Sequence, residues 1–359
     1  MPDADDIQTS LAPIIQLLMN HRRVGLVAHP RMDADAMGSV LGLSESLRAA
    51  GFITQPFTQG RYPDYLQFLP AADTLHEWSG REHWPHAWKP DVVVVLDIGS
   101  IGRVEPFLGS LARLWDGAHY TPPGGGKLGE LPFRVINIDH HPSNESFGDA
   151  AWVRPAACSC GEMMVDLLRA AELPITREVA WNLYAAIMSD TGSFSYSNTT
   201  PRAMRIAADL IEAGADPDVI SSEHYRTKPA GELKLHARIL DRLSVSDNGW
   251  LAWSWVRQSD FAELGIGPEN TSDLVNLVTQ LATARVAVLF TEMSPPQVGT
   301  RISFRGKGYH DLNMIAHYWG GGGHVRASGA TVDRPLDEVM PEVLQRLMSA
   351  TDHDSPQRF

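Results

Sequence analysis

Carboxylate and imidazole side chains recur just after apolar segments in the N-terminal half of the chain. In order, they are His29, Asp33, Asp35, Asp97, Asp139, His140, His141 and Asp190. Ligands of α/β sheets bind at the carboxyl ends of the strands, so we expect these side chains to end at one sheet edge. A single Asp there is usually a turn or cap residue. Gathered without Lys or Arg, however, carboxylates repel one another, and divalent metal is the ordinary way to hold them close.

The mixture of ligand types narrows the choice of metal. Imidazole combined with carboxylate suits manganese, iron or zinc better than calcium. The cluster also offers enough groups for two ions. The sequence therefore predicts a divalent-metal site that can hold two ions.

A second group of candidate residues lies in the C-terminal part of the chain. Gly320, Gly321, Gly322 and Gly323 are followed by His324, and Arg326 comes two residues later. Successive glycine N–H groups can form an anion-binding nest, although flexible loops look the same. Arg305 ends an alternating segment, and residues 285–334 hold six basic against three acidic side chains. This locally basic region favours phosphate binding, with a solvated surface as the alternative.

The elements that must position the first group alternate between strands and helices. Strands are predicted at 24–28, 52–57, 91–97 and 134–139, and helices at 7–19, 37–50, 160–171, 177–188, 201–212 and 231–243. The β-branched residues of 91–97 are typical of a parallel strand covered on both faces. The pattern predicts a doubly wound α/β domain with a mainly parallel sheet. Ser159 and Glu162 form a capping-box pattern, and the neighbouring Cys158 and Cys160 are interpreted as packing residues.

The pattern restarts near residue 250 and predicts a second, smaller α/β domain. Its strands are expected at 250–256, 286–291 and 300–304, and its helices at 312–318 and 336–348. We predict a catalytic domain at 1–215, a helical linker at 216–248, a substrate-binding domain at 249–351 and a frayed tail at 352–359. A flexible Gly/Pro-rich loop is expected at 116–130.

Composition excludes some classes of protein. Among 359 residues, 43 acidic side chains outnumber 30 basic ones, which gives a formal net charge of −13. This charge disfavours a protein that binds long nucleic acid through many phosphates, but leaves a short or metal-bridged phosphate ligand open. No export signal and no apolar run approaching roughly 18 residues is present. With two cysteines only, we expect a soluble cytoplasmic protein without a membrane partner.

Taken in order, the motifs resemble the DHH phosphoesterase superfamily. They are His29-x-x-x-Asp33-x-Asp35-Ala-Met-Gly-Ser39, Asp97, Asp139-His140-His141 and Ser189-Asp190-Thr-Gly-Ser-Phe194. Ser303-Phe-Arg305 and Gly320-Gly-Gly-Gly-His324 look like the C-terminal domain associated with that superfamily. The resemblance covers about residues 15 to 350. Without membrane, sensor or further nucleic-acid modules, the chain looks most like the stand-alone NrnA type, a group of oligoribonucleases and pAp phosphatases.

The resemblance implies two metal ions, usually manganese, in an active-site cleft between the two domains, and a role for each motif residue. One ion would be held by His29, Asp33 and Asp97, and the other by Asp35, Asp97, His140 and Asp190. Asp97 would bridge the two, Asp139 would orient a histidine, and His141 would face the scissile phosphate. Substrate contacts are expected from Arg103, Arg305, Gly321, Gly322, Gly323, His324 and Arg326. Arg326 stands where the superfamily usually has a small or neutral polar residue.

The predicted function is therefore a manganese-dependent hydrolase of phosphate esters. Its expected substrates are short oligoribonucleotides, linear dinucleotides such as pApA, and pAp, cleaved by water activated between two metals. A cyclic-dinucleotide phosphodiesterase and an inorganic pyrophosphatase are alternatives with the same metal site, and a catalytically silent nucleotide-binding regulator is an alternative of another class. The net charge disfavours a long-DNA exonuclease and a duplex partner. A homodimer is left open.

Overall fold

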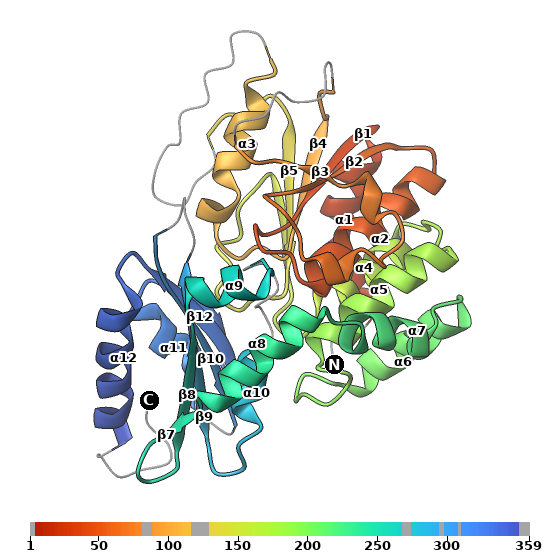
Figure 1. The fold of residues 1–359 in the computed structure, drawn as a ribbon. Helices are drawn as coiled ribbons and strands as arrows, with labels where there is room; N and C mark the ends of the chain where they lie inside the picture. Colours follow the sequence, from red (N-terminus) through yellow and green to blue (C-terminus); the bar gives the residue numbers. More distant parts are fainter. Residues whose placement is uncertain are drawn as a thin grey trace. The chain divides into compact units, whose positions relative to one another are not determined.

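The computed structural model describes residues 4–80, 88–115, 129–267, 274–293, 298–307 and 310–351. The chain forms two compact units, divided between Thr227 and Lys228 (Figure 1). Most of the loop predicted at 116–130, and the tail predicted at 352–359, lie outside the described residues.

The first unit is built on a six-stranded parallel sheet. Its strands are β1 (Arg23–Val27), β2 (Ile53–Thr58), β3 (His76–Glu77), β4 (Val92–Leu96), β5 (Arg134–Asp139) and β6 (Ala150–Val153). Their order across the sheet is β3-β2-β1-β4-β5-β6. The chain winds outward from β1 in one direction and from β4 in the other, so the prediction of a doubly wound parallel sheet is confirmed. The point where the winding reverses, between β1 and β4, is where such sheets bind ligands.

Helices cover both faces of this sheet. They are α1 (Ala4–Met19), α2 (Ala34–Ala49), α3 (Glu105–Ala112), α4 (Cys160–Ala170), α5 (Arg177–Asp190), α6 (Pro201–Glu212) and α7 (Pro217–Ser221). One apolar core joins α1, α2, α4, α5 and α6 to the sheet, and another joins α3 to its other face. The strand β4 is buried along its whole length, as its run of valines predicts. The burial of this strand fixes the position of the residue that follows it, Asp97.

Three helices of this unit touch through glycines. A Cβ atom on Gly38 of α2 would lie 2.4 Å from the carbonyl oxygen of Asn182 in α5. A Cβ on Gly42 would meet Leu183 at 2.7 Å, and one on Gly161 of α4 would meet Ala186 at 2.6 Å. At Gly38 the neighbour is a backbone atom and at Gly161 it is a Cβ atom, and neither can turn away, so these two crossings require glycine. At Gly42 the neighbour is the Leu183 side chain, which could shift.

The second unit is a mixed sheet between two layers of helices. Its strands are β7 (Ser244–Val245), β8 (Leu251–Val256), β9 (Val286–Met293), β10 (Gly299–Gly306), β11 (Gly322–His324) and β12 (Ala327–Val332), in the order β11-β12-β10-β9-β8-β7. The strands β8 and β9 are parallel and the other pairs are antiparallel. One face packs on α11 (Leu312–His317) and α12 (Leu336–Thr351), and the other on α8 (Ala230–Asp241), α9 (Gln258–Leu264) and α10 (Val275–Thr279).

The segment predicted as a linker is shared between the two units. Ile220 of α7 belongs to the core of the first unit. Leu235 and Ile239 of α8 are fully buried in the core of the second. The domain limits at 215 and 249 stay predictions, but half of the predicted linker is part of a folded core.

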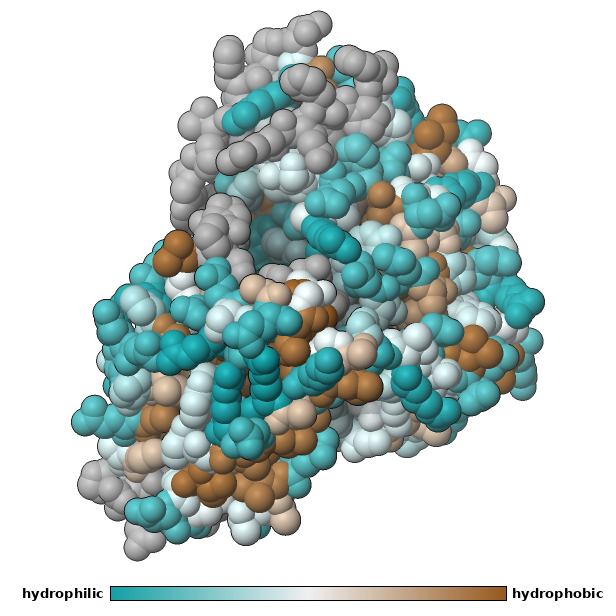
Figure 2. All heavy atoms as spheres, viewed as in Figure 1, coloured by the Kyte–Doolittle hydropathy of each residue, from teal (hydrophilic) through white to brown (hydrophobic). Residues whose placement is uncertain are grey.

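None of the helices in the described ranges is both long enough and apolar enough to cross a bilayer. The longest, α1, α2 and α12, have 16 residues each. The surface seen in Figure 2 is mainly hydrophilic, with apolar side chains in scattered groups.

Candidate metal centre

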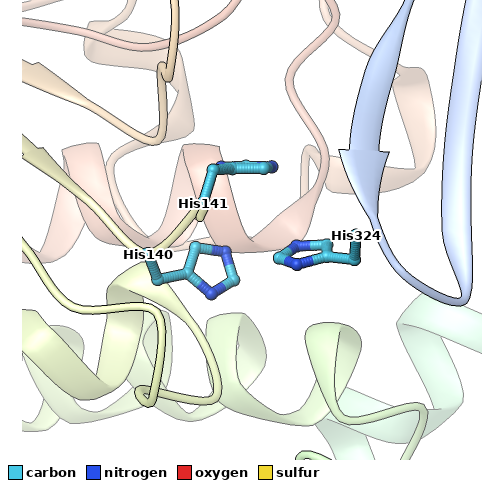
Figure 3. A group of neighbouring side chains, drawn as sticks. All are labelled: His140, His141 and His324. Atoms are coloured by element: carbon cyan, nitrogen blue, oxygen red, sulfur yellow. The ribbon is translucent and has the colours of Figure 1, made fainter. Parts of the chain in front are cut away.

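The predicted ligand residues converge near the reversal point of the first sheet. His29 lies two residues beyond β1, and Asp97 directly follows the neighbouring strand β4. Asp139 is the last residue of β5, and His140 and His141 follow it at once (Figure 3). The parallel alignment of β1, β4 and β5 thus brings three separate stretches of sequence to one edge.

Two candidate ligands reach the cluster from helices. Asp190 follows the predicted helix 177–188 and is the last residue of α5, with its carboxylate near Asp35 and His140. Asp35 lies in the first turn of α2, which begins earlier than predicted because Asp33 caps it by accepting a hydrogen bond from Ala36 N. The helix packing through Gly38 and Gly42 brings these carboxylates to the strand ends.

The ligand atoms form overlapping sets. Within each set, the ligand atoms lie within 4.8 Å of one another. Three of the sets contain Asp97: it lies with His29 and Asp33, with Asp35 and Cys160, and with Asp139 and His141. A further set consists of Asp35, His140 and Asp190. Nε2 of His140 lies 3.5 Å from Oδ1 of Asp97 and 3.7 Å from an oxygen of Asp35 and of Asp190. Nε2 of His29 lies 3.4 Å from Oδ2 of Asp97. Asp97 thus stands between the two groups of residues that the superfamily resemblance assigns to two ions.

Asp97 is held at an energetic cost. Its φ angle is 56°, in the left-handed region that residues other than glycine rarely adopt. Such a conformation costs on the order of 1–3 kcal/mol. The side chain is 3% exposed, and within the described residues its Oδ1 makes no hydrogen bond of good geometry. A buried carboxylate oxygen without a donor fits a metal ligand.

The charges of the cluster do not balance without a cation. Burial, followed by the charges of Asp97 and Asp190, raises the pKa of Asp35 well above its usual range. Burial also raises the pKa of Asp190 to about 6. Burial alone would raise the pKa of Asp97 too, but the imidazoles of His140 and His29 outweigh it and hold that pKa well below its usual range. Carboxylates that compete in this way for two histidines fit divalent cations, which would satisfy all of them together.

The carboxylate of Asp139 binds two side chains. Its Oδ1 lies 2.7 Å from Nδ1 of His141, and its Oδ2 accepts a hydrogen bond of 2.6 Å from Asn144. Asn144 also donates to the carbonyl of Ile98, beside Asp97. Burial would lower the pKa of His141, but the hydrogen bond that its ring donates to Asp139 outweighs burial, so the pKa of His141 is raised. Asn144 was not among the residues singled out from the sequence, because an Asn in a turn carries no signal of its own.

The two cysteines are buried and free, as their interpretation as packing residues predicts. Burial raises the pKa of both thiols. Cys160 is closer to the cluster than expected, since its Sγ lies among the oxygens of Asp35 and Asp97. Arg103 ends a 3₁₀ turn after β4 and is exposed.

The remaining predicted residues lie in the second unit. Arg305 is half-buried on β10, His324 ends β11 (labelled in Figure 3), and Arg326 is exposed in the following turn. Gly322 and Gly323 lie in β11 and pair with β12, so half of the glycine run is strand and not loop. A Cβ on Gly321 would lie 2.1 Å from the carbonyl oxygen of Gly329. The hairpin itself therefore requires glycine, and the predicted anion contact of this run stays a prediction.

Known proteins are similar to this chain over nearly its whole length. A family model described as the DHH family, N-terminal domain, matches residues 23–187. The bifunctional oligoribonuclease and PAP phosphatase NrnA of Bacillus subtilis is 30% identical over 322 residues, which cover 89% of this chain and 92% of that protein. The protein of the same name from Thermus thermophilus is 29% identical, with 90% of each chain covered.

Solved structures share the fold. An exopolyphosphatase-related protein from Bacteroides fragilis aligns over 96% of both chains with a TM-score of 0.80 and 22% identity. RecJ of Thermus thermophilus in complex with Mn²⁺ aligns over 98% of this chain and 55% of its own, with a TM-score of 0.51 and 13% identity. Both likenesses concern the fold alone. The ordered motifs and the relatives that match nearly the whole chain show that the chain belongs to the DHH family of phosphoesterases, in its NrnA-type group. This confirms the prediction made from the motifs.

Proposed function

We propose that this chain is a metal-dependent hydrolase of short oligoribonucleotides, including linear dinucleotides such as pApA, and of pAp. The observation that supports it best is the place of Asp97 between two sets of ligand atoms. The relatives named as oligoribonucleases and PAP phosphatases suggest the substrates. Membership of a phosphoesterase family gives the reaction class, the hydrolysis of phosphate esters.

The residues proposed as ligands form two groups that share Asp97. One contains His29, Asp33 and Asp97, and the other Asp35, Asp97, His140 and Asp190. When bound, two divalent ions, most simply Mn²⁺, would lower the pKa of a shared water and neutralise phosphoryl oxygens. The mixed carboxylate and imidazole donors, which include the unsatisfied oxygen of Asp97, fit such ions.

His141 and Asp139 are proposed to act together on the phosphate. The contact with Asp139 holds the Nδ1 side of the ring, which leaves Nε2 to donate a proton towards a phosphoryl or leaving oxygen. The raised pKa of His141 favours the protonated ring that such a donor needs. Asp139 is buried and also held by Asn144, so a turn of the ring would break its hydrogen bond to an acceptor that is itself fixed.

Phosphate contacts are proposed for residues of both units. They are Arg103, Arg305, Gly321, Gly322, Gly323, His324 and Arg326. Guanidinium groups bind phosphate oxygens in pairs, and backbone N–H groups add neutral donors. A site that binds the end of a short substrate needs no basic track along the surface, which is consistent with the net charge of −13. A cytoplasmic location and an assembly beyond the monomer stay predictions.

Product analysis tests the proposal. The chain is incubated with Mn²⁺ and, in parallel, pApA, a five-nucleotide RNA, cyclic di-AMP, pAp and a 40-nucleotide RNA, and products are separated by ion-exchange chromatography. We expect mononucleotides from the short linear RNAs and phosphate from pAp, with both lost in Asp97→Asn. Consumption of cyclic di-AMP or of the long RNA alone would contradict the proposed substrates. Binding without turnover would contradict hydrolysis itself.

A further inference from the structure

The first turn of α4 holds the carboxylate of Asp35. Oδ2 accepts a hydrogen bond of 2.8 Å from Cys160 N, and Oδ1 accepts one of 2.9 Å from Gly161 N. These N–H groups open the helix and have no partner within it, and the helix dipole favours a negative charge at this end. Both oxygens of Asp35 are therefore tied to the segment Cys158–Glu162, termed here the α4 turn.

The same turn is joined to Asp190 by one side chain. Nδ2 of Asn198 donates to the carbonyl oxygen of Cys158 and to that of Asp190, each at 3.0 Å. Both hydrogens of the amide are thus used, one on the α4 turn and one on the end of α5. Because two carbonyl oxygens face this nitrogen, they fix which way the amide points.

The α4 turn is itself held from outside the metal centre. Glu162, which is 1% exposed, accepts hydrogen bonds from Cys158 N at 3.1 Å and from Nε of Arg202 at 3.0 Å. Arg202 also pairs with Asp166, which in turn accepts a bond of 2.6 Å from Arg154. Two arginines and two carboxylates thus balance their charges beside the turn. This group needs no metal to stay in place.

We propose that Asn198 is a positioning residue of the metal centre, which fixes the main chain of Asp190 relative to Asp35 through the α4 turn. This rests on the proposed function, since it takes Asp35 and Asp190 as ligands of one ion. Two carboxylates that repel each other need such a restraint to keep a common spacing before metal binds. The restraint acts on the backbone that carries Asp190, so it sets where that carboxylate can lie.

Direct measurement of Mn²⁺ binding tests this inference. Asn198→Asp keeps the shape of the side chain and removes both donors, and Asn198→Ser keeps one donor. The matched control is Thr199→Val, because the hydroxyl of the adjacent Thr199 is buried and, in the described part of the chain, makes no hydrogen bond. Metal-stripped full-length protein is titrated with Mn²⁺ by calorimetry, and unfolding temperatures are recorded without metal.

We expect Asn198→Asp to bind Mn²⁺ about 10- to 100-fold more weakly, the range typical of residues that orient metal ligands. The Mn²⁺ affinity of Asn198→Ser should lie between that of Asn198→Asp and that of the unchanged chain. If Asn198→Asp does not fold, Asn198→Ser tests the inference in its place. Thr199→Val should bind as the unchanged chain does. Unchanged affinity in the folded Asn198 variants, with only a lower metal-free unfolding temperature, would overturn the inference. Absence of Mn²⁺ binding by the unchanged chain would instead overturn the proposed function on which it rests.

Discussion

Buried carboxylates have different cationic partners in the two units. In the second unit, Asp260 is 2% exposed and binds Arg238, Arg242 and the backbone N–H of Arg257. Burial alone would raise the pKa of Asp260, but the hydrogen bonds, first that from Arg242, lower it to about 2. In the first unit, the ion pairs that Asp35, Asp97 and Asp190 form with described residues are all with histidines.

The difference supports the proposal that the carboxylates of the first cluster are metal ligands. Arginines balance the charge of Asp260, so this carboxylate stabilises the fold without a further partner. In the described residues Asp35, Asp97 and Asp190 form no ion pair with an arginine, which fits a proposed role for cations in balancing their charge. The group of Glu162 and Asp166 with Arg202 and Arg154 shows that the first unit also pairs its carboxylates with arginine where no ligand is needed.

The largest expected effect comes from Asp97→Asn. The change keeps the size of the side chain but weakens the ligand shared by both sets, so phosphate release from pAp should fall about 10³-fold, or ~4 kcal/mol of transition-state stabilisation. Steady-state assays at saturating Mn²⁺ measure it. Activity within tenfold of the unchanged chain would show that Asp97 is not shared by two ions.

Metal binding should stabilise the chain through the unbalanced cluster. At a free Mn²⁺ concentration of about 100 times Kd, the gain should be ~2.7 kcal/mol by mass action. Calorimetric unfolding with and without Mn²⁺ measures it, and Asp97→Asn should lose most of the gain. An equal gain in Asp97→Asn would place the stabilising ion elsewhere.

Acid should weaken the arginine-paired carboxylate. The pKa of Asp260 in the folded chain is about 2, below its usual 3.8. Its pairing therefore stabilises the fold above about pH 4 and is lost as the pH falls towards 2. The contribution is about 2 kcal/mol.

Urea unfolding at pH 7 and pH 3 checks this pH dependence. The decline should be smaller in Asp260→Asn, because that variant has no carboxylate to protonate at this position. Equal declines in the two proteins would refute it.

The smallest effect is expected at an exposed pair. Arg169 and Asp209 lie 2.6 Å apart with both side chains nearly half exposed. Solvent screens such pairs, so Asp209→Asn should change the free energy of unfolding by at most ~0.5 kcal/mol. Urea unfolding in low and high salt checks it. A loss comparable to that of Asp260→Asn would mean that burial does not cause the difference between the two kinds of pair.

The sequence predicts the parts of this molecule that depend on local pattern. The valines of β4 and the residues that follow β1, β4 and β5 could be placed because strand ends are local features. The spacing between Asp35 and Asp190 could not be predicted, since it depends on α2 packing against α5 at Gly38 and Gly42.

Other features depend on partners far away in the sequence. Asn198 reaches a carbonyl 40 residues earlier, and the positive φ of Asp97 has no signature in residue type. The glycine run reads as a loop until its pairing with β12 is known.

The close approach of α2 and α5 at Gly38 limits the residues that the first unit can accept at this position. A Cβ atom there would lie 2.4 Å from the carbonyl oxygen of Asn182, a main-chain atom that cannot turn away. Any side chain larger than that of glycine would therefore push the two helices apart. Because Asp35 lies in the first turn of α2 and Asp190 ends α5, a residue with no ligand atom of its own thus governs the spacing of two carboxylates.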